Sequence, residues 1–416
     1  MLHESLIADA QTVAGEITAL RRAIHADPEL GLGNPRTRDK IRAALAHLPL
    51  EWREGLSTTG LVATLKGGTG DGRCVLLRAD TDALPMPEET GLPFASAVPG
   101  AMHACGHDAH VAMLAGAAEI LCRRVTSLKG EVRFMFQPGE EGHHGARFML
   151  DDGLLGGSLP GREGHAAPLP DAAFALHVMP NAPHGMIGGR AGPLLASADQ
   201  IEITVNGRGG HASMPHDTLD PVPVACEIVT AIQTMVTRKF TVMDPVVVTI
   251  SRIEAGSTHN VIADTARMLG TMRSLSAKSR ARLRQEVELL ATCIAAAHGL
   301  TAQVTVEEGF PVTVCDAHAV DLGEQVAKGL FGENAFRRLA DPIMGAEDFS
   351  YVLEKVPGAM FFIGFAHAGE DWRQCCGIHS SRMMLDESVM PQGAAFLAGL
   401  ATRFLETGFA SEGPAG

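Results

Sequence analysis

Apolar side chains recur first at helical and then at strand-like intervals along the first half of the chain. A spacing of three and four residues is typical of helices, whereas short, near-continuous apolar runs are typical of strands buried on both faces of a sheet. The pattern predicts helices at 6–24, 41–48 and 110–124, and strands at 60–68, 73–80, 131–137 and 172–179. Because helices and strands alternate, we predict an α/β domain with a mostly parallel sheet between helices.

The pattern changes between residues 192 and 306. It predicts, in chain order, a strand at 200–207, a helix at 221–238, strands at 246–256 and 266–275, a helix at 279–299 and a strand at 301–309. This βαββαβ order is that of a ferredoxin-like domain.

The α/β pattern returns after residue 306, with a helix at 319–332, a strand at 359–365 and a long terminal helix. A chain of 416 residues is long enough for about two domains. We therefore predict one discontinuous α/β domain, 1–191 and 307–416, into which the ferredoxin-like domain, 192–306, is inserted.

Composition excludes several classes of protein. No run of about 18 apolar residues predicts a membrane span. The net charge of −14 is not arranged in blocks, which argues against nucleic acid or an anionic membrane as a partner. The early acidic residues and helical pattern of the N-terminus are unlike a signal peptide, and eight scattered cysteines favour reduced thiols. We therefore expect a cytoplasmic location.

The segment HACGHDAH holds the densest cluster of chemically active side chains. Cys105 and His107 lie two residues apart in a bend before a predicted helix, followed by Asp108 and His110. A thiolate and an imidazole at this spacing reach one metal centre, and Zn²⁺ accepts both. The bend is also compatible with a capped helix and a buried cysteine.

The segment QPGEEG places Glu140 and Glu141 directly after a predicted buried strand. Functional groups in open α/β sheets commonly occupy this position. If one glutamate binds a metal and the other lies over a metal-bound water, the second acts as a general base. A solvated acidic turn is the alternative interpretation.

Two further histidines, His177 and His379, lie where apolar segments end. Each alone is compatible with a hydrogen-bonded core histidine. Together with Cys105, His107 and Glu141, they form a set of five ligands that suits two divalent ions such as Zn²⁺, Mn²⁺, Co²⁺ or Ni²⁺. With two anionic ligands against two divalent ions, such a site keeps positive charge and attracts an anionic substrate.

Segments spread over nearly the whole chain carry a family resemblance. They are RRAIHADPEL, LLRADTDALPM, PGAMHACGHDAHVAML, QPGEEG, ALHVMP, VNGRGGHASMPH, THNVIAD, GTMRS, MGAEDF and the region of His379 with Asp386 and Glu387. In this order they resemble the aminoacylase, hippurate hydrolase and auxin-conjugate hydrolase branch of the co-catalytic metallopeptidases. The resemblance implies a zinc-exopeptidase-like catalytic domain and gives the inserted ferredoxin-like domain the role of a lid and dimerisation domain.

The resemblance also implies roles for individual residues. It assigns Glu140 as the general base and two metal ions to five ligands, namely Cys105, His107, Glu141, His177 and His379. Broader relatives carry a His-x-Asp metal motif where this chain has Arg78-Ala79-Asp80. Arginine does not bind metal, so Asp80 is expected to orient a ligand.

The inserted domain is expected to contribute substrate contacts. By resemblance, His211 and Asn260 stabilise the oxyanion and hold substrate, often in the site of a neighbouring subunit. Arg273 resembles a residue that grips the substrate carboxylate, for which a forked guanidinium is suited. Gly345 would let substrate approach the backbone. From the residues alone, Arg273 is also compatible with an exposed strand-end charge, and Gly345 with a turn glycine.

The expected reaction is hydrolysis of the amide bond of small N-acyl-amino acids, such as hippurate-like or N-acetyl substrates. A metal-bound hydroxide would attack the amide carbon while Glu140 moves the proton to the leaving nitrogen. The expected partners are a small-molecule substrate and a second copy of the chain, as a homodimer or higher homo-oligomer.

Three alternatives remain beside this expectation. A dipeptidase or carboxypeptidase would use the same metal site, although related peptidases more often carry Asp where Cys105 stands. A hydrolase with Cys105 as nucleophile leaves the glutamate pair without a role. A catalytically inactive binding protein predicts a damaged ligand set, whereas all five expected ligands are present.

Overall fold

The computed structural model describes residues 2–70, 72–156, 167–366 and 377–409. The chain forms two compact units. Unit 1 consists of Met1–Leu194, Val314–Asp341 and Asp348–Gly416, and unit 2 consists of Leu195–Thr313 with the short segment Pro342–Glu347. Unit 1 is therefore discontinuous in sequence. The segment Pro342–Glu347, which the sequence pattern left with the larger domain, belongs to unit 2.

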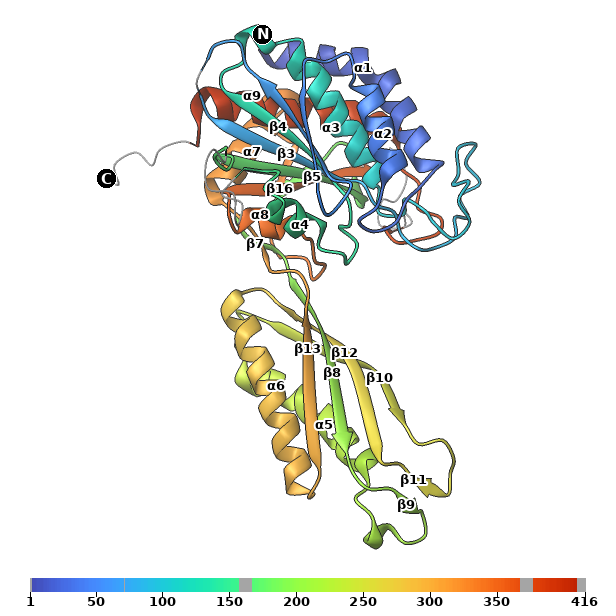
Figure 1. Cartoon of the computed structure of the whole chain (residues 1–416). Helices are drawn as coiled ribbons and strands as arrows, with labels where there is room; N and C mark the ends of the chain where they lie inside the picture. The colour runs from blue at the N-terminus through green and yellow to red at the C-terminus, as the bar shows by residue number, and fades with distance from the viewer. Residues whose placement is uncertain (1, 71, 157–166, 367–376, 410–416) are drawn as a thin grey trace, which may run out of the picture. The chain divides into compact units, whose positions relative to one another are not determined.

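Unit 1 is built on an eight-stranded mixed sheet (Figure 1). In spatial order its strands are β1 (Glu51–Glu54), β2 (Leu61–Lys66), β4 (Glu131–Gln137), β3 (Cys74–Asp80), β5 (Ala172–Pro183), β16 (Gly358–Ala366), β6 (Ile187–Gly189) and β15 (Phe336–Arg338). The four central strands β4, β3, β5 and β16 run parallel. Every residue of β3 and of β16 is buried, which explains their continuous apolar runs.

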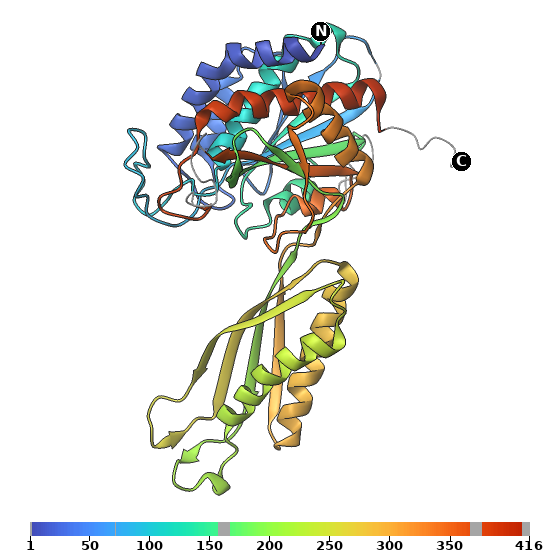
Figure 2. The ribbon, with the colours of Figure 1, turned by 180° about the vertical axis from the view of Figure 1, so that it is seen from behind.

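Helices cover both faces of this sheet. They are α1 (Leu2–His25), α2 (Pro35–Ala44), α3 (His107–Cys122), α4 (Gly145–Asp151), α7 (Ala317–Phe331), α8 (Ser350–Leu353) and α9 (Met390–Thr407). Helices α1, α3 and α9 pack against one another on one face, whereas α4 and α8 lie together on the other (Figures 1 and 2). Helix α3 is buried throughout, and it begins three residues earlier than the apolar pattern predicted. This earlier start places His107 in the first helical turn.

The second helix also differs from its prediction. Helix α2 begins at Pro35, where proline suits the first helical position, and it ends at Ala44. Leu45 follows as a buried C-cap residue. Of the apolar side chains that predicted a helix at 41–48, Ile41 therefore packs from the helix and Leu45 from the turn after it.

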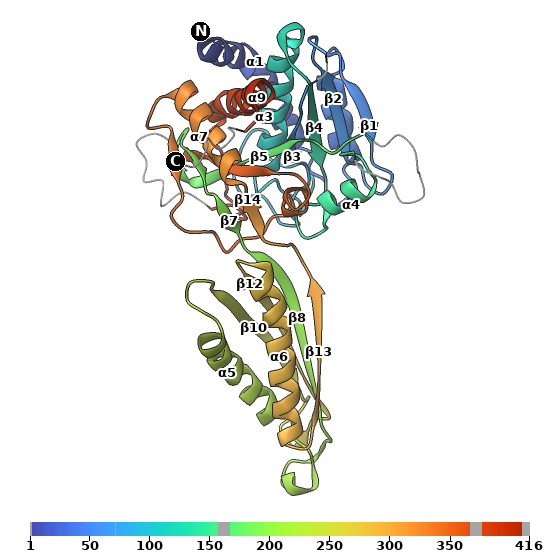
Figure 3. The ribbon, with the colours of Figure 1, turned by 90° about the vertical axis from the view of Figure 1, so that its left-hand side faces the viewer.

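Unit 2 confirms the predicted ferredoxin-like order (Figure 3). Its elements are β8 (Ser197–Asn206), α5 (Pro221–Lys239), β10 (Val246–Ala255), β12 (Thr265–Ser274), α6 (Ala277–Ala297) and β13 (Thr301–Glu308). The antiparallel sheet has the order β10-β12-β8-β13, and both helices pack on it and on each other. A short ribbon of unit 2 pairs β9 (Gly210–His211) with β11 (Val261–Ile262). A second ribbon, β7 (Gly192–Leu195) with β14 (Thr313–Cys315), lies at the sequence boundary of the two units.

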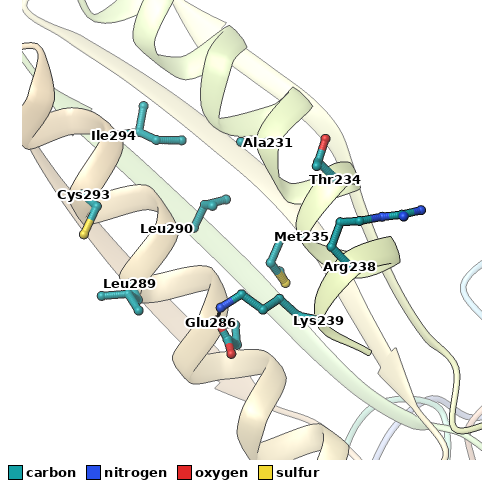
Figure 4. A pocket seen from close by; sticks show the side chains of 10 residues that line it. All are labelled: Ala231, Thr234, Met235, Arg238, Lys239, Glu286, Leu289, Leu290, Cys293 and Ile294. Carbon is teal, nitrogen blue, oxygen red and sulfur yellow. Dashed lines mark ion pairs between the residues drawn. The ribbon is translucent and has the colours of Figure 1, made fainter. Parts of the chain in front are cut away.

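An apolar groove lies between α5 and α6 of unit 2 (Figure 4). Its volume is about 500 Å³, and its lining includes Met235, Leu290 and Ile294. Leu289 beside it is 58% exposed, and Lys239 forms a 3.4 Å ion pair with Glu286 at its rim. Among the described residues, the helices lack the combination of length and apolar character that a bilayer crossing requires.

Candidate metal centre

The carboxyl ends of the central parallel strands bring together residues that are distant in sequence. Asp80 ends β3 and lies in register with Gln137 at the end of β4, whose chain continues into the glutamate pair. His177 lies on β5. Crevices at this edge of an open α/β sheet are the usual location of ligand sites.

A tight bend before α3 positions Cys105 and His107. The bend turns at Gly106, whose φ of +88° lies in the left-handed region, where side chains are disfavoured. A Cβ at this position would lie 2.5 Å from Val178 Cγ2, so the close approach to β5 also requires glycine. The bend places Cys105 Sγ 3.5 Å from His177 Nε2. The two residues are buried and come from different elements.

Backbone carbonyls fix the orientation of both imidazoles. His177 Nδ1 donates to Val178 O at 2.7 Å, and His107 Nδ1 donates to Asp82 O at 2.8 Å. His177 Nε2 is therefore turned toward Cys105, and His107 Nε2 toward Asp80 and Glu141. A hydrogen bond at one nitrogen that leaves the other available is the usual arrangement of a metal-binding histidine.

Glu141 and His379 form a second part of the cluster. Glu141 Oε1 lies 3.3 Å from His379 Nε2 and 4.0 Å from His107 Nε2. His379 adopts a φ of +65°, which is uncommon for a residue with a side chain, and its N–H donates to Ala104 O at 2.8 Å. A strained backbone held in place by a hydrogen bond is typical of a functional position.

The structure brings all five predicted ligands and Glu140 into overlapping groups. In each group the potential ligand atoms lie within 4.8 Å of one another. The groups are Cys105 with His107 and His177, Cys105 with Glu141 and His379, and His107 with Glu140 and Glu141.

The hydrogen bonding of two buried atoms in this cluster indicates whether the site fits cations. His107 Nε2 and Glu141 Oε1 are buried, and neither has a hydrogen-bond partner among the described residues. Buried polar atoms normally have partners, because burial without one is costly. A thiol, imidazoles and a carboxylate with bare atoms facing one another are the donor set that borderline divalent ions prefer. The residues therefore fit a pair of such ions.

The electrostatics of the metal-free cluster differ between its side chains. Burial would lower the pKa of His107, but Asp80 raises it well above its usual range, so this imidazole must lose a proton before it binds a cation. Burial raises the pKa of the Cys105 thiol to about 12, although His107 beside it acts in the other direction. Burial lowers the pKa of His177 well below its usual range, and His110 adds to the effect. A neutral imidazole already has the protonation state of a ligand, whereas the thiol needs a cation to become a thiolate.

Asp80 lies beside the Nε2 of His107 in a dense polar network, with its Oδ2 3.5 Å from that nitrogen. Burial alone would raise its pKa, but His107, Arg78 and His110 together hold that pKa well below its usual range. Arg78 Nη1 donates to Asp80 Oδ2 at 2.8 Å, and Asp80 Oδ1 lies 2.6 Å from His110 Nδ1. His110 Nε2 accepts from Val178 N at 2.9 Å, so both of its ring nitrogens are engaged. This arrangement supports an orienting role for Asp80.

The remaining predicted site residues lie in unit 2. His211 is in strand β9 and pairs with Val261 of β11, so the glycine-rich segment forms a short ribbon at this residue. Asn260 O accepts from Ala212 N at 3.1 Å, which places the segments of His211 and Asn260 side by side, both exposed. Arg273 is half-buried on β12 and donates to Met272 O at 3.1 Å. A Cβ at Gly345 would meet only ordinary contacts, the nearest at 3.4 Å.

Two buried carboxylates beside the cluster were not assigned roles from sequence. Asp82 accepts hydrogen bonds from the backbone of both glutamates of the pair. Asp108, next to His107, accepts from Arg21 Nε at 2.8 Å and lies 2.8 Å from His25 Nδ1. The signal for Asp82 was its place just after a buried strand in DTDALPM, and the signal for Asp108 was its place in the HACGHDAH bend.

Sequence comparison identifies the family. The profile of peptidase family M20/M25/M40 matches residues 76–403. The chain belongs to this family. Members include the N-acetylcysteine deacetylase of Bacillus subtilis, 37% identical over 93% of this chain and 96% of its own, and an IAA-amino acid hydrolase of Arabidopsis thaliana, 37% identical over 93% of this chain and 84% of its own. The resemblance to the aminoacylase and auxin-conjugate hydrolase branch is confirmed.

Solved structures of the family confirm the fold. A Bacillus subtilis protein described as a dinuclear metal-binding M20 peptidase is 34% identical, has a TM-score of 0.80, and aligns over 95% of this chain and 99% of its own. A putative aminohydrolase of methicillin-resistant Staphylococcus aureus is 27% identical, with a TM-score of 0.87 over 97% of this chain and 100% of its own. The M20 fold, a large mixed sheet between helices with an inserted smaller domain, is therefore the fold of this chain.

Proposed function

We propose that this protein is a metal-dependent amidohydrolase that cleaves N-acyl-amino acids into a carboxylic acid and a free amino acid. The observation that carries the proposal is the convergence of five side chains of metal-ligand type, with Glu140 in the same cluster. Two of their buried atoms, His107 Nε2 and Glu141 Oε1, have no hydrogen-bond partner among the described residues. Relatives named as an N-acetylcysteine deacetylase and an IAA-amino acid hydrolase support this substrate class, because both names describe an acylated amino acid.

Each residue of the cluster has a proposed role. Cys105, His107, His177, Glu141 and His379 would hold two divalent ions, and Glu140 would act as the general base. Bound ions of this kind lower the pKa of water and stabilise negative charge on a carbonyl oxygen. Glu140 takes a proton from the attacking water and delivers it to the leaving nitrogen, because its carboxyl lies beside the ligands and its backbone is anchored.

The polar groups of unit 2 keep their predicted roles as part of this proposal. His211 and Asn260 would stabilise the oxyanion, and Arg273 would bind the substrate carboxylate with its guanidinium. The guanidinium of Arg273 suits this role because it is half-buried and donates hydrogen bonds to neutral acceptors, Thr271 Oγ1 and Met272 O. Gly345 would let substrate approach the backbone.

A second candidate function is a carboxypeptidase or dipeptidase. A protein named thermostable carboxypeptidase 1, from Saccharolobus solfataricus, is 36% identical over 97% of this chain and 99% of its own. The same cluster would attack any amide placed over it, so substrate binding decides between the two.

The test is hydrolysis of a small panel by chelator-stripped protein, before and after addition of Mn²⁺, Zn²⁺ or Co²⁺. The panel contains hippurate, N-acetyl-methionine, an indole-acetyl amino acid and a dipeptide. We expect metal-restored cleavage of an acylated amino acid. Cleavage of the dipeptide alone would favour the peptidase, and no metal-dependent cleavage would contradict both.

We also propose a homodimer and a cytoplasmic location. Symmetric dimers are the commonest assemblies of soluble enzymes, and exposed Leu289 beside an apolar groove suits an interface between copies. Six cysteines among the described residues are free thiols, which suits a reducing compartment. Light scattering and cell fractionation test the two statements separately.

A further inference from the structure

Asp82 binds the glutamate pair through the backbone. Its Oδ1 accepts from Glu140 N and its Oδ2 accepts from Glu141 N, each at 3.0 Å. The carboxylate is 1% exposed, so the two hydrogen bonds form without competition from water. One carboxylate therefore holds two consecutive peptide N–H groups that lie 58 and 59 positions away in sequence.

The same residue also holds a predicted metal ligand. The backbone carbonyl of Asp82 accepts from His107 Nδ1 at 2.8 Å, and that bond turns His107 Nε2 toward the cluster. Asp82 thus contacts the proposed base and two proposed ligands, although it belongs to neither set. Its side chain acts on the glutamates, whereas its backbone acts on the histidine.

The loop that carries the glutamates needs this support in its middle. Its two ends are held by Asp348, which accepts from Gln137 Nε2 at 2.7 Å and from Ala146 N at 2.9 Å. Between these points the backbone has positive φ at Gly139 and at Gly142. Two turn hydrogen bonds, from Gly142 N to Glu140 O at 2.7 Å and from Gly145 N to Gly139 O at 3.0 Å, close this loop on itself. The carboxylate of Asp82 is the contact that ties the closed loop to the chain after β3.

We propose that Asp82 is a positioning residue that sets the geometry of the glutamate pair. This inference rests on the proposed function for its catalytic consequence, but the restraint itself is a property of the fold. In Asp82→Asn the backbone carbonyl to His107 is kept. The side chain keeps one acceptor oxygen and turns an NH₂ group toward the second peptide N–H, so one donor loses its partner.

The experiment compares Asp82→Asn with a matched control, Asp152→Asn. Asp152 Oδ2 also accepts two consecutive peptide N–H groups, from Leu56 at 2.8 Å and Ser57 at 3.0 Å, but on the surface of unit 1. For Asp82→Asn we expect faster amide hydrogen exchange at Glu140 and Glu141, a kcat about 10–100-fold lower at saturating metal, and a KM within about threefold of wild type. The control should leave both constants within about twofold.

Hydrogen exchange at the amides of Glu140 and Glu141 reports on the two hydrogen bonds to Asp82 independently of enzyme activity. In the wild-type protein the amides of Glu140 and Glu141 should exchange slowly, comparably to those of β4. Fast exchange in the wild type, or an Asp82→Asn variant with wild-type exchange and kcat, would overturn the role of Asp82. If the variant fails to fold, the wild-type exchange rates decide. A wild type that protects these amides but cleaves no panel substrate would refute the proposed function and leave the restraint intact.

Discussion

The two units of this protein treat buried polar groups in opposite ways. Unit 1 buries a dense set of charged and titratable side chains near the strand ends, among them Arg78, Asp80, His107 and Asp108. The core of unit 2 is apolar, and its strand β8 alternates strictly between buried and less buried residues. Its buried carboxylate Asp199 is neutralised by Arg280 at 2.6 Å and Arg284 at 2.9 Å.

This difference indicates that the buried charges of unit 2 serve stability, whereas those of unit 1 serve the functional site. Burying charge is costly unless the charge is paired, so a fold selected for stability alone buries little of it. Unit 2 follows that rule, since its polar burial is satisfied within the described residues around Asp199. Unit 1 departs from it and leaves His107 Nε2 and Glu141 Oε1 without hydrogen-bond partners among the residues described, although both lie within ion-pair distance of charged neighbours. Such unsatisfied, buried groups are typical of a functional site.

The largest expected effect in unit 1 comes from Glu140→Gln. Loss of the general base should lower kcat by about two to four orders of magnitude, because the substitution keeps the shape and removes the proton acceptor. Metal content by elemental analysis should not change. Loss of metal in this variant would show that the roles of the two glutamates are exchanged.

Replacement of a ligand should act on metal affinity. For Cys105→Ser we expect the affinity for at least one divalent ion to fall by about a hundredfold, because a hydroxyl is a far poorer anionic ligand than a thiolate. Isothermal titration of the chelator-stripped protein measures the change, with Cys226→Ser, at an exposed position of α5, as the control. Equal affinity in both variants would remove Cys105 from the ligand set.

The corresponding change in unit 2 should act on stability. Asp199→Asn leaves Arg280 and Arg284 without their charged partner, and we expect it to lower the free energy of unfolding by about 2 kcal/mol. Metal affinity in unit 1 should stay within about twofold. Denaturant unfolding and metal titration on the same samples separate the two effects, and reduced metal affinity would contradict the division between the units.

A pH dependence follows from the same carboxylate. Burial would raise the pKa of Asp199, but hydrogen bonds from Arg280 and Arg284 lower it below its ordinary value of 3.8. A lowered pKa contributes stability that is present above the ordinary value and is lost as pH falls toward the folded value. We therefore expect wild-type unit 2 to lose stability below about pH 4, and Asp199→Asn to lose less over the same range.

The smallest effect should come from the groove of unit 2. Leu289→Gln alters an exposed side chain, so the unfolding free energy should change by less than about 0.5 kcal/mol and kcat should not change. If the groove joins two copies, the same variant should shift the dimer toward monomer in light scattering. An unaltered dimer would place the interface elsewhere.

Much of this molecule was predictable because local pattern and chemistry agree. The buried runs of β3 and β4 and the βαββαβ order of unit 2 followed from periodicity, and the structure reproduces them. The convergence of Cys105 and His177 also followed, because both lie at one edge of a parallel sheet. Helix α2 was placed too late, since the apolar side chains of its C-terminal turn look the same as helical ones.

The supporting residues were harder to find from the sequence. A carboxylate after a strand suggests function, but the sequence does not show that Asp82 accepts two N–H groups 58 and 59 residues away. The pairing of His211 with Val261 is also hidden in the sequence, because the glycine neighbours of His211 give no strand signal. Such roles depend on backbone atoms, which carry no side-chain signature in a sequence.

The insertion has a consequence for how the protein is made. Strand β16 lies between β5 and β6 in the sheet of unit 1, and α9 packs on α1 and α3. The whole of unit 2 is synthesised before β16 and α9, because its last segment, Pro342–Glu347, precedes both in the chain. Nascent unit 2 therefore has its four strands and two helices available early, whereas β5 waits with an unpaired edge that invites aggregation. We expect co-translational chaperones to engage unit 1 until the C-terminal segments emerge.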